Sequence, residues 1–322
     1  LIAPFISNWL AAVALAVGVV VIVLIGRWAM RAVHEARQGN GPYAWLTGPG
    51  VLPQWLRPLG LPPLREAILT LHAPPRDADA IDEEELERLV PRVDIETLVP
   101  SASLASLGDA SWKVRKEALE GVHAALAPHP RLKGAAGELC AALKARYADN
   151  NIMVRTLALD IAAQLANGLH AQLEPYVRTL VPPITQVLAD SKAPLRASAA
   201  SALTAIEAQV GLPAMVAAMA PVLDGKGANP MLRQDAFTWL GERMAAQLPA
   251  DLDVVPLLPS VLQSLDDRTP GVRKASQALL PYLVARAGYK VVIEHCDTLR
   301  SASRATAVPL VDAARPAAAA LG

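Results

Sequence analysis

An aspartate and an arginine recur together along the chain at a fixed spacing. In four copies the arginine stands six positions after the aspartate and follows an aliphatic residue, as in GDASWKVRK (108–116). A fifth copy, DGKGANPMLRQ (224–234), has three more residues between the two charges. Opposite charges can bind a ligand or join two parts of a protein, and the repetition favours the second use. We predict that each aspartate caps the helix after it, and that each arginine reaches the aspartate of a neighbouring unit. This structural ladder comprises Asp109, Arg115, Asp149, Arg155, Asp190, Arg196, Arg233, Asp267 and Arg273.

The residues between each aspartate and arginine vary from copy to copy, which makes them candidates for contact with a partner. Trp112 at a turn tip beside Lys113 has the features of an interface anchor, because Trp is over-represented at binding hot spots. Lysines on the same edge would meet an acidic surface. The alternatives are that Trp112 folds back on its own unit and that the lysines are ordinary solvated side chains. The predicted binding residues are Trp112, Lys113, Asn151, Ile152, Ser191, Lys192, Asn229, Arg268 and Lys274.

Histidines and cysteines do not show the spacing of a catalytic or metal site. His123 and His129 stand near prolines without a spaced carboxylate or cysteine, and His295 and Cys296 are adjacent on a helix, so they diverge by about 100°. No glycine-rich phosphate loop follows a strand. Cys140 and Cys296 are expected to be small buried apolar residues in a reducing compartment. We therefore predict no enzyme, no metal site and no cofactor.

Helices must position these residues, because apolar residues recur three or four apart on both sides of each aspartate. In the first unit the expected core positions after the aspartate are Val114, Leu119, Val122 and Leu126. Helices before the later aspartates are expected at 139–147, 176–188, 215–223 and 257–265, and a further unit at 289–315.

Successive arginines of the pattern lie 40, 41, 37 and 40 positions apart. This is the period of two-helix HEAT or armadillo units, which bury their apolar faces by stacking. The sequence predicts an all-α HEAT-repeat solenoid of about six helical pairs in residues 85–322, with every turn inside a unit at one edge.

Composition agrees with helix packed on helix. Hydrophobic residues make up 53% and aromatic residues only 4% of the chain, with Ala and Leu dominant. The 30 basic residues equal the 30 acidic ones, whereas a nucleic-acid binder usually has a basic excess. We expect no nucleic-acid partner, and an acidic partner would have to be met by a local patch.

The N-terminal region allows two interpretations. Residues 1–26 carry no charge, and WLAAVALAVGVVVIVLIG (9–26) is long enough to cross a bilayer. Trp9 and Trp28 flank the run and arginines follow it on the C-terminal side, so residues 1–38 would be a transmembrane helix with a basic flank and a cytoplasmic domain after it. The alternative is a non-native stretch, such as a translated intron or a misjoined exon. Residues 39–84 read as a Pro/Gly-rich and acidic linker.

The segment from LVPRVDI (89–95) to about Pro316, about 70% of the chain, resembles a TOG domain of the ch-TOG and Minispindles family of microtubule polymerases. SWKVRKEAL (111–119) resembles the first tubulin-contacting loop of that family and LADSKAPLRASA (188–199) the third. ANPMLRQDAFTWL (228–240) resembles the fourth loop and LDDRTPGVRKASQALLPYL (265–283) the fifth. The lead-in LVPR and the last two loops are most like the fourth TOG domain of those arrays.

The resemblance implies a module that binds one αβ-tubulin dimer through the loop edge and promotes microtubule growth and organisation. It implies β-tubulin contacts for Trp112, Lys113, Ile152 and Lys192, with Asn229, Arg268 and Lys274 facing α-tubulin. The implied location is the cytoplasmic cytoskeleton: microtubule plus ends, spindle or centrosome.

Three features depart from the family. Ile152 is larger than the usual residue there, the charge-free N-terminal run has no counterpart, and the family's array of several domains with a basic linker is not seen. Polymerase activity is therefore not assigned to this segment alone. The competing hypothesis is a generic HEAT scaffold, of a transport or phosphatase type, that holds another partner.

Overall fold

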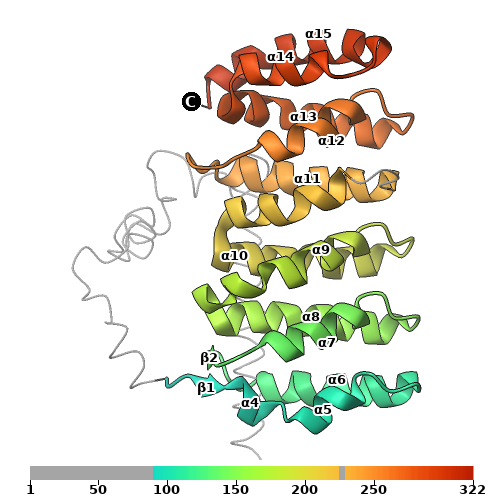
Figure 1. The fold of residues 1–322 in the computed structure, drawn as a ribbon, viewed down its shortest axis with the longest axis vertical. Coiled ribbons are helices and arrows are strands. Elements are labelled where there is room, and N and C mark those ends of the chain that lie inside the picture. Colours follow the sequence, from blue (N-terminus) through green and yellow to red (C-terminus); the bar gives the residue numbers. More distant parts are fainter. Residues whose placement is uncertain (1–89, 225–228, 322) are drawn as a thin grey trace, which may run out of the picture. The chain divides into compact units, whose positions relative to one another are not determined.

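The computed structural model describes residues 90–224 and 229–321. The expected transmembrane helix (1–38) and linker (39–84) lie outside these residues. The described part is a column of antiparallel helix pairs stacked one on another (Figure 1). The elements, in chain order, are β1 (Val93–Asp94), α4 (Ile95–Leu98), α5 (Ser101–Ser106), α6 (Trp112–Leu126), β2 (Leu132–Lys133), α7 (Gly137–Arg146), α8 (Ile152–Leu169), η3 (His170–Tyr176), α9 (Val177–Val187), α10 (Ala193–Leu223), α11 (Pro230–Ala246), η4 (Val255–Leu257), α12 (Leu258–Ser264), α13 (Pro270–Ala287), α14 (Tyr289–Asp297) and α15 (Ser301–Ala319).

These helices form six pairs in the described residues, which confirms the expected HEAT-repeat solenoid. The first helices of the repeats are α5, α7, α9, the second half of α10, α12 and α14, and the second helices are α6, α8, the first half of α10, α11, α13 and α15. The observed bounds of α7, α9 and α12 agree with the expected first helices to within two residues, because each has a continuous apolar stripe. The second half of α10 follows Gly211 directly and so begins three residues before the expected 215.

The α10 segment is two helices separated by a kink at Gly211. Gly211 has φ 78° and ψ 160°, a backbone conformation that is essentially open only to glycine. The first half closes the third repeat and the second half opens the fourth, so the chain reverses direction in a single residue (Figure 1). By length and composition α10 is also the one described helix that could cross a membrane. It is, however, two shorter helices joined at Gly211, and its buried residues pack inside the stack.

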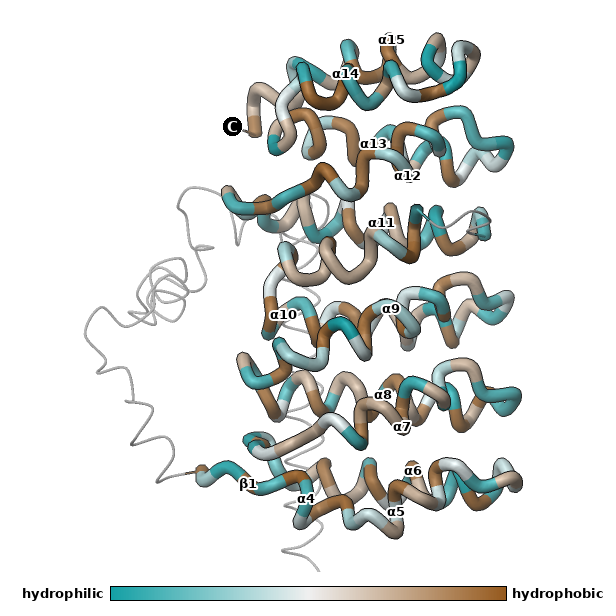
Figure 2. Tube along the Cα trace, in the orientation of Figure 1, coloured by the Kyte–Doolittle hydropathy of each residue, from teal (hydrophilic) through white to brown (hydrophobic). Residues whose placement is uncertain are grey.

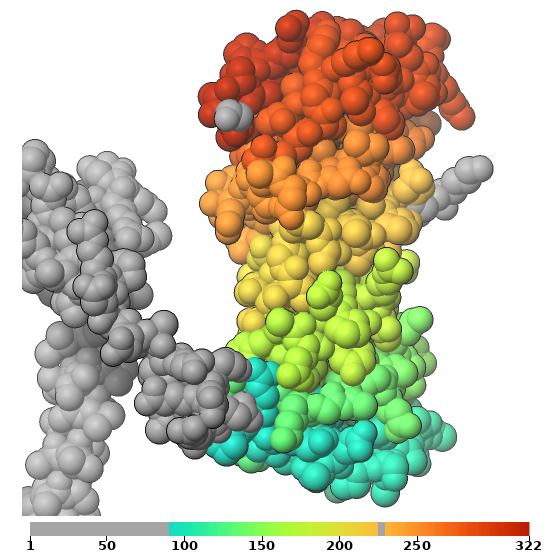
Figure 3. All heavy atoms as spheres, turned by 60° about the vertical axis from the view of Figure 1, so that its left-hand side comes forward, coloured from blue at the N-terminus to red at the C-terminus, as the bar shows by residue number. Residues whose placement is uncertain are grey.

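The apolar core is continuous along the column. Buried residues of neighbouring repeats form one cluster from Ile95 to Ala318, and the hydrophobic colours of Figure 2 recur in every repeat while the turns at one edge are hydrophilic. Seen as spheres, the repeats follow one another along the column in chain order (Figure 3). The stack can therefore be treated as repeats that each contact only their neighbours.

The prediction of Val114 as a core residue is wrong. Val114 is 38% exposed, although its equivalents Val154, Leu195, Leu232 and Val272 are buried. The first described pair, α5 and α6, has no earlier described repeat against it, so the outer face of α6 is open.

A short extended pair adds a feature that the helical periodicity did not indicate. Val93 and Asp94 pair in parallel with Leu132 and Lys133. This bridge joins the chain before the first repeat to the connection between the first two repeats, and it leaves the all-α class unchanged.

Candidate partner-binding edge

The turns inside the first five repeats lie on the same edge of the column, on the right in Figure 1. We call this the loop edge: the turns that begin at Asp109, Asp149, Asp190, Asp224 and Asp267, with the first turn of the helix after each. Residues 225–228 of the fourth turn lie outside the described part.

The repeated aspartates shape the turns and do not cap the following helices. The Oδ1 atom accepts a hydrogen bond from the backbone amide two residues on, at 2.7 Å for Asp109, 3.0 Å for Asp149 and 2.8 Å for Asp190 and Asp267. The N-cap of the helix is that second residue, so the predicted capping role is wrong for these aspartates. Each instead closes an Asx turn just outside the helix.

Four of the five arginines of the pattern bind backbone carbonyls at their own turn. In the first, third and fifth repeats an Nη1 donor reaches the carbonyl oxygens of the turn aspartate and of the next residue, at 2.8–3.3 Å. Arg155 Nε donates instead to the Tyr147 carbonyl at 2.8 Å. These donors satisfy turn carbonyls that have no helical partner, and they fix the shape of the turn.

Four of the five ladder arginines, Arg115, Arg155, Arg196 and Arg233, also join neighbouring repeats. Arg115 binds Asp149 of the second repeat through both Nε (2.7 Å) and Nη2 (2.8 Å), and Arg155 binds Asp190 of the third at 2.6 Å. Arg233 of the fourth repeat binds Asp267 of the fifth at 3.2 Å. A bidentate pair of this kind holds two groups in a defined orientation.

One connection of the ladder departs from the expected pattern. Arg196 of the third repeat binds Asp235, at 2.7 Å, and not the turn residue Asp224. Asp235 lies inside α11, so the third repeat is tied to the helix of the fourth repeat and not to its turn. The longer spacing between Asp224 and Arg233 accounts for the difference.

Asp149 is the most buried carboxylate of the ladder, with a side chain that is 2% exposed. Burial is the largest influence on it and opposes ionisation, but hydrogen bonds from Arg115 and from the Asn151 amide outweigh it, so the pKa of Asp149 lies below its usual range. Arg146 adds a second ion pair at 3.1 Å. The pKa of Asp190 is lowered too, first by the hydrogen bond from the Lys192 amide.

The structure brings the predicted binding residues to the loop edge or close beside it. Trp112 is 42% exposed as the first residue of α6, and Lys113, Ser191, Lys192 and Arg268 are exposed at the turns. Ile152 is half-buried and packs against the core. Lys274 is exposed but lies one turn into α13, beside a groove between α11 and α13.

Two predicted binding residues have a structural role as well. Asn151 caps α8 and Asn229 caps α11, each by accepting a hydrogen bond on its side-chain oxygen from the amide two residues on, at 2.8 Å. Their side-chain NH₂ groups are still donors at the edge.

Sequence reasoning missed two exposed apolar residues of the loop edge. Met153 is 51% and Met231 is 39% exposed, and each stands two positions before a ladder arginine. Aligning the copies on the arginine places both methionines one position before an aliphatic residue that is buried in the second and fourth repeats, Val154 and Leu232.

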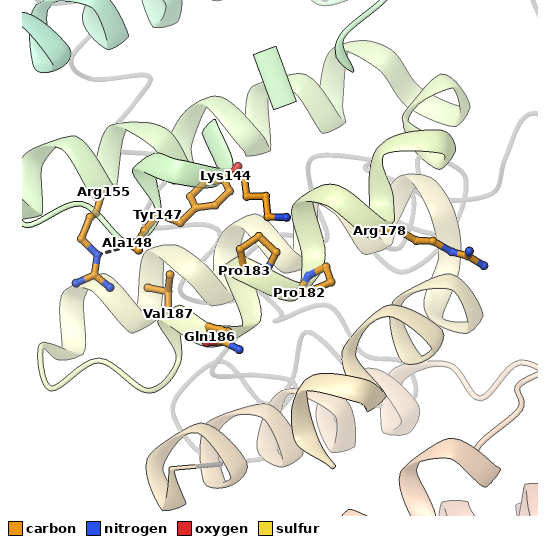
Figure 4. Close-up of a pocket in the computed structure, with 9 residues that line it drawn as sticks. All are labelled: Lys144, Tyr147, Ala148, Arg155, Arg178, Pro182, Pro183, Gln186 and Val187. Atoms are coloured by element: carbon orange, nitrogen blue, oxygen red, sulfur yellow. Dashed lines mark hydrogen bonds between the residues drawn. The ribbon is translucent and has the colours of Figure 1, made fainter. Parts of the chain in front are cut away.

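Other hollows on the described surface are open grooves between helices of neighbouring repeats. One of about 410 Å³ lies between α7 and α9, with Pro182 and Pro183 between Arg155 on one side and Arg178 on the other (Figure 4). Arg155 belongs to both this groove and the ladder, and Ala148 on the groove directly precedes the turn aspartate Asp149.

Within the described residues, the histidine and cysteine side chains do not gather into a metal site. No group of three His, Cys, Asp or Glu side chains could hold a metal ion there. Cys140 and Cys296 are buried and free, as expected, and burial raises the pKa of Cys140 to about 12. A thiol with such a pKa is not a nucleophile at neutral pH.

Comparison with known proteins finds similar sequences over the repeats. The protein Mini spindles of Drosophila melanogaster is 28% identical over 232 residues, which cover 71% of this chain and 11% of the fly protein. Centrosomal protein 224 of Dictyostelium discoideum is 29% identical over 206 residues, covering 60% of this chain and 10% of that protein. The chain thus spans about a tenth of the length of these relatives. No protein-family model matches it.

Solved structures share the fold. A chain from a study of microtubule plus-end tracking by XMAP215, CLIP-170 and EB1 has a TM-score of 0.56 at 24% identity, covering 73% of this chain and 97% of that one. A chain from a study of TOG–tubulin binding specificity has a TM-score of 0.52 at 15% identity, covering 74% and 99%. The described residues therefore form a HEAT-repeat solenoid with the fold of a TOG domain, similar in sequence to a segment of Mini spindles.

Proposed function

We propose that the described residues are a tubulin-binding module of the Mini spindles group of microtubule-associated proteins, and that the loop edge binds one αβ-tubulin dimer. The module would act in the microtubule cytoskeleton, at plus ends, spindle or centrosome, and would promote microtubule growth as part of a longer protein. Its role is to hold a partner and not to catalyse a reaction.

Trp112 is the observation that carries the proposal. A tryptophan that is 42% exposed, at the tip of a turn and beside Lys113, presents a large apolar ring to solvent. Trp anchors of this kind dominate binding energy at protein interfaces. The arginine ladder holds that tip in line with the turns of the next repeats, which favours one extended contact with a single large partner.

The edge would divide between the two tubulin subunits. Trp112, Lys113, Asn151, Ile152, Ser191 and Lys192 of the first three repeats would contact β-tubulin. Asn229, Arg268 and Lys274 of the fourth and fifth would contact α-tubulin. The fourth and fifth turns, NPMLRQ and DDRTPGVRK, support a position equivalent to the fourth domain of an array.

The test is Trp112→Ala, measured by titration with soluble tubulin. Loss of the anchor should weaken binding by roughly 2–4 kcal/mol, about 30-fold to 1,000-fold in Kd, with no change in helicity or Tm. Val255→Ala is the matched control, because Val255 is also exposed (37%) but lies in the connection between α11 and α12, away from the loop edge.

Equal losses of Tm and of binding in Trp112→Ala would show that Trp112 is a packing residue. Unchanged tubulin binding in this variant would reject the loop edge as the tubulin site and favour a scaffold that binds its partner elsewhere.

A further inference from the structure

The second and fourth repeats share a local sequence that the other three do not. NIMVR (151–155) and NPMLR (229–233) both read Asn, any residue, Met, an aliphatic residue and Arg. At the methionine position the first, third and fifth repeats have Lys113, Pro194 and Gly271. Two copies with one pattern, with one repeat between them, place the same side chain twice along one edge.

The structure builds the two sites in the same way. Asn151 and Asn229 are the N-caps, and each accepts its hydrogen bond at 2.8 Å from the amide of Met153 or Met231 itself. The cap fixes the methionine as the second residue of its helix, so the side chain points to the edge while the next residue enters the core. Val154 and Leu232 are accordingly 0% and 4% exposed.

The other described methionines are protected. Met215 and Met219 are fully buried in α10, and Met244 is 1% exposed in α11. A reagent in solution therefore meets two thioethers at the loop edge and is kept from the three in the core.

We propose that Met153 and Met231 are a matched pair of oxidation sites that control partner binding by the loop edge. The control of tubulin rests on the function proposed above, whereas the selective oxidation rests on exposure alone. The reduced thioethers give the edge two flexible apolar contacts of the kind that adaptable binding surfaces use. As sulfoxides they are polar, and docking would have to remove water from each new S–O group.

The chemical step needs a peroxide as the oxidant. The sulfur lone pair attacks one oxygen of hydrogen peroxide, an S–O bond forms, and the O–O bond breaks. The thioether loses two electrons and becomes a sulfoxide, and the peroxide is reduced to water. A methionine sulfoxide reductase reverses the change with electrons from a thiol.

The experiment treats the whole chain with hydrogen peroxide and removes the peroxide with catalase before tubulin is added. Peptide mass spectrometry should find oxygen on Met153 and Met231 well before it appears on Met215, Met219 or Met244. Tubulin affinity should fall about tenfold and recover after treatment with the reductase. The variant Met153→Leu with Met231→Leu is compared with its own untreated form, and peroxide treatment should leave its affinity at the value measured before treatment.

Similar oxidation rates for edge and core methionines would overturn the proposal, as would an oxidised chain that binds tubulin unchanged. Loss of binding in the double leucine variant on treatment would assign the effect to another residue and also overturn it. If the untreated chain does not bind tubulin, the proposed function fails and control of tubulin fails with it. In that case the peptide masses alone still test whether Met153 and Met231 are oxidised before the core methionines.

Discussion

Single side chains of the ladder make the fold sensitive to acid. The hydrogen bonds to Asp149 hold its pKa below the usual range, so the carboxylate stabilises the folded state at neutral pH. That contribution is lost as the pH falls through the lowered pKa, below about 4. The ion pairs of the ladder are therefore expected to stabilise the folded state at neutral pH and to lose this contribution in acid.

Replacing Asp149 with Asn tests this effect. At pH 7 the variant leaves Arg115 and Arg146 without their charged partner, and Tm should fall by about 5 °C. The difference from the unmodified chain should narrow as the pH drops below about 4, because the native carboxyl is then protonated as well. Thermal melts followed by circular dichroism at several pH values measure it, with Asp224→Asn at an exposed turn as the control. A pH-independent difference would show that shape and not charge is what Asp149 contributes.

At the level of helices, the positions where helices begin and end depend on single residues that the periodicity of apolar residues does not reveal. The stripes of apolar residues indicated the six helix pairs, because each repeat must bury one face of each helix. They did not indicate Gly211, since apolar residues continue through it on both sides. The pattern also placed Val114 in the core, because every other copy of that position is covered by a preceding repeat.

Gly211→Ala should destabilise the protein by about 1–3 kcal/mol, because a Cβ at φ 78° and ψ 160° is strained whatever the space around it. Gly121→Ala is the matched control in the middle of α6, where an added Cβ meets nothing within 4 Å. That change should stabilise by about 0.5–1 kcal/mol through helix propensity. Urea unfolding of both variants gives the comparison, and equal effects of the same sign would contradict a strained turn at Gly211.

Only part of the candidate site could be predicted from the sequence. The turns could be located, because the aspartate and arginine mark them in every repeat. The missed methionines stand where other copies have Lys, Pro or Gly, so no shared residue type marks that position. The role of the aspartates was also wrong, since an Asx turn and an N-cap need the same residue type and differ only in where the helix begins.

For the whole molecule, the zero net charge means that attraction to an acidic partner must come from a local patch of charge, for which the loop edge is the candidate. Lys192 and Lys274 are exposed there, on the third and fifth repeats. Changing both to Glu should slow association with tubulin several-fold and reduce the dependence of the rate on salt. Stopped-flow mixing at several salt concentrations measures this. Lys290→Glu on α14 is the control, with a side chain that is 90% exposed outside the five turns. An unchanged salt slope in the double variant would remove these lysines from the binding edge.

The bypass of the fourth turn by the Arg196–Asp235 pair bears on how this fold tolerates changes in chain length. In the second, third and fifth repeats, the turn aspartate is itself an anchor of the stack, so added residues there would disturb the register of two neighbouring units. In the fourth repeat the anchor is already inside α11, and the copy is three residues longer than the others with the stack intact. A change of length between Asp224 and Asn229 is therefore expected to leave the alignment of the repeats unaltered, since the anchor of that connection lies in α11.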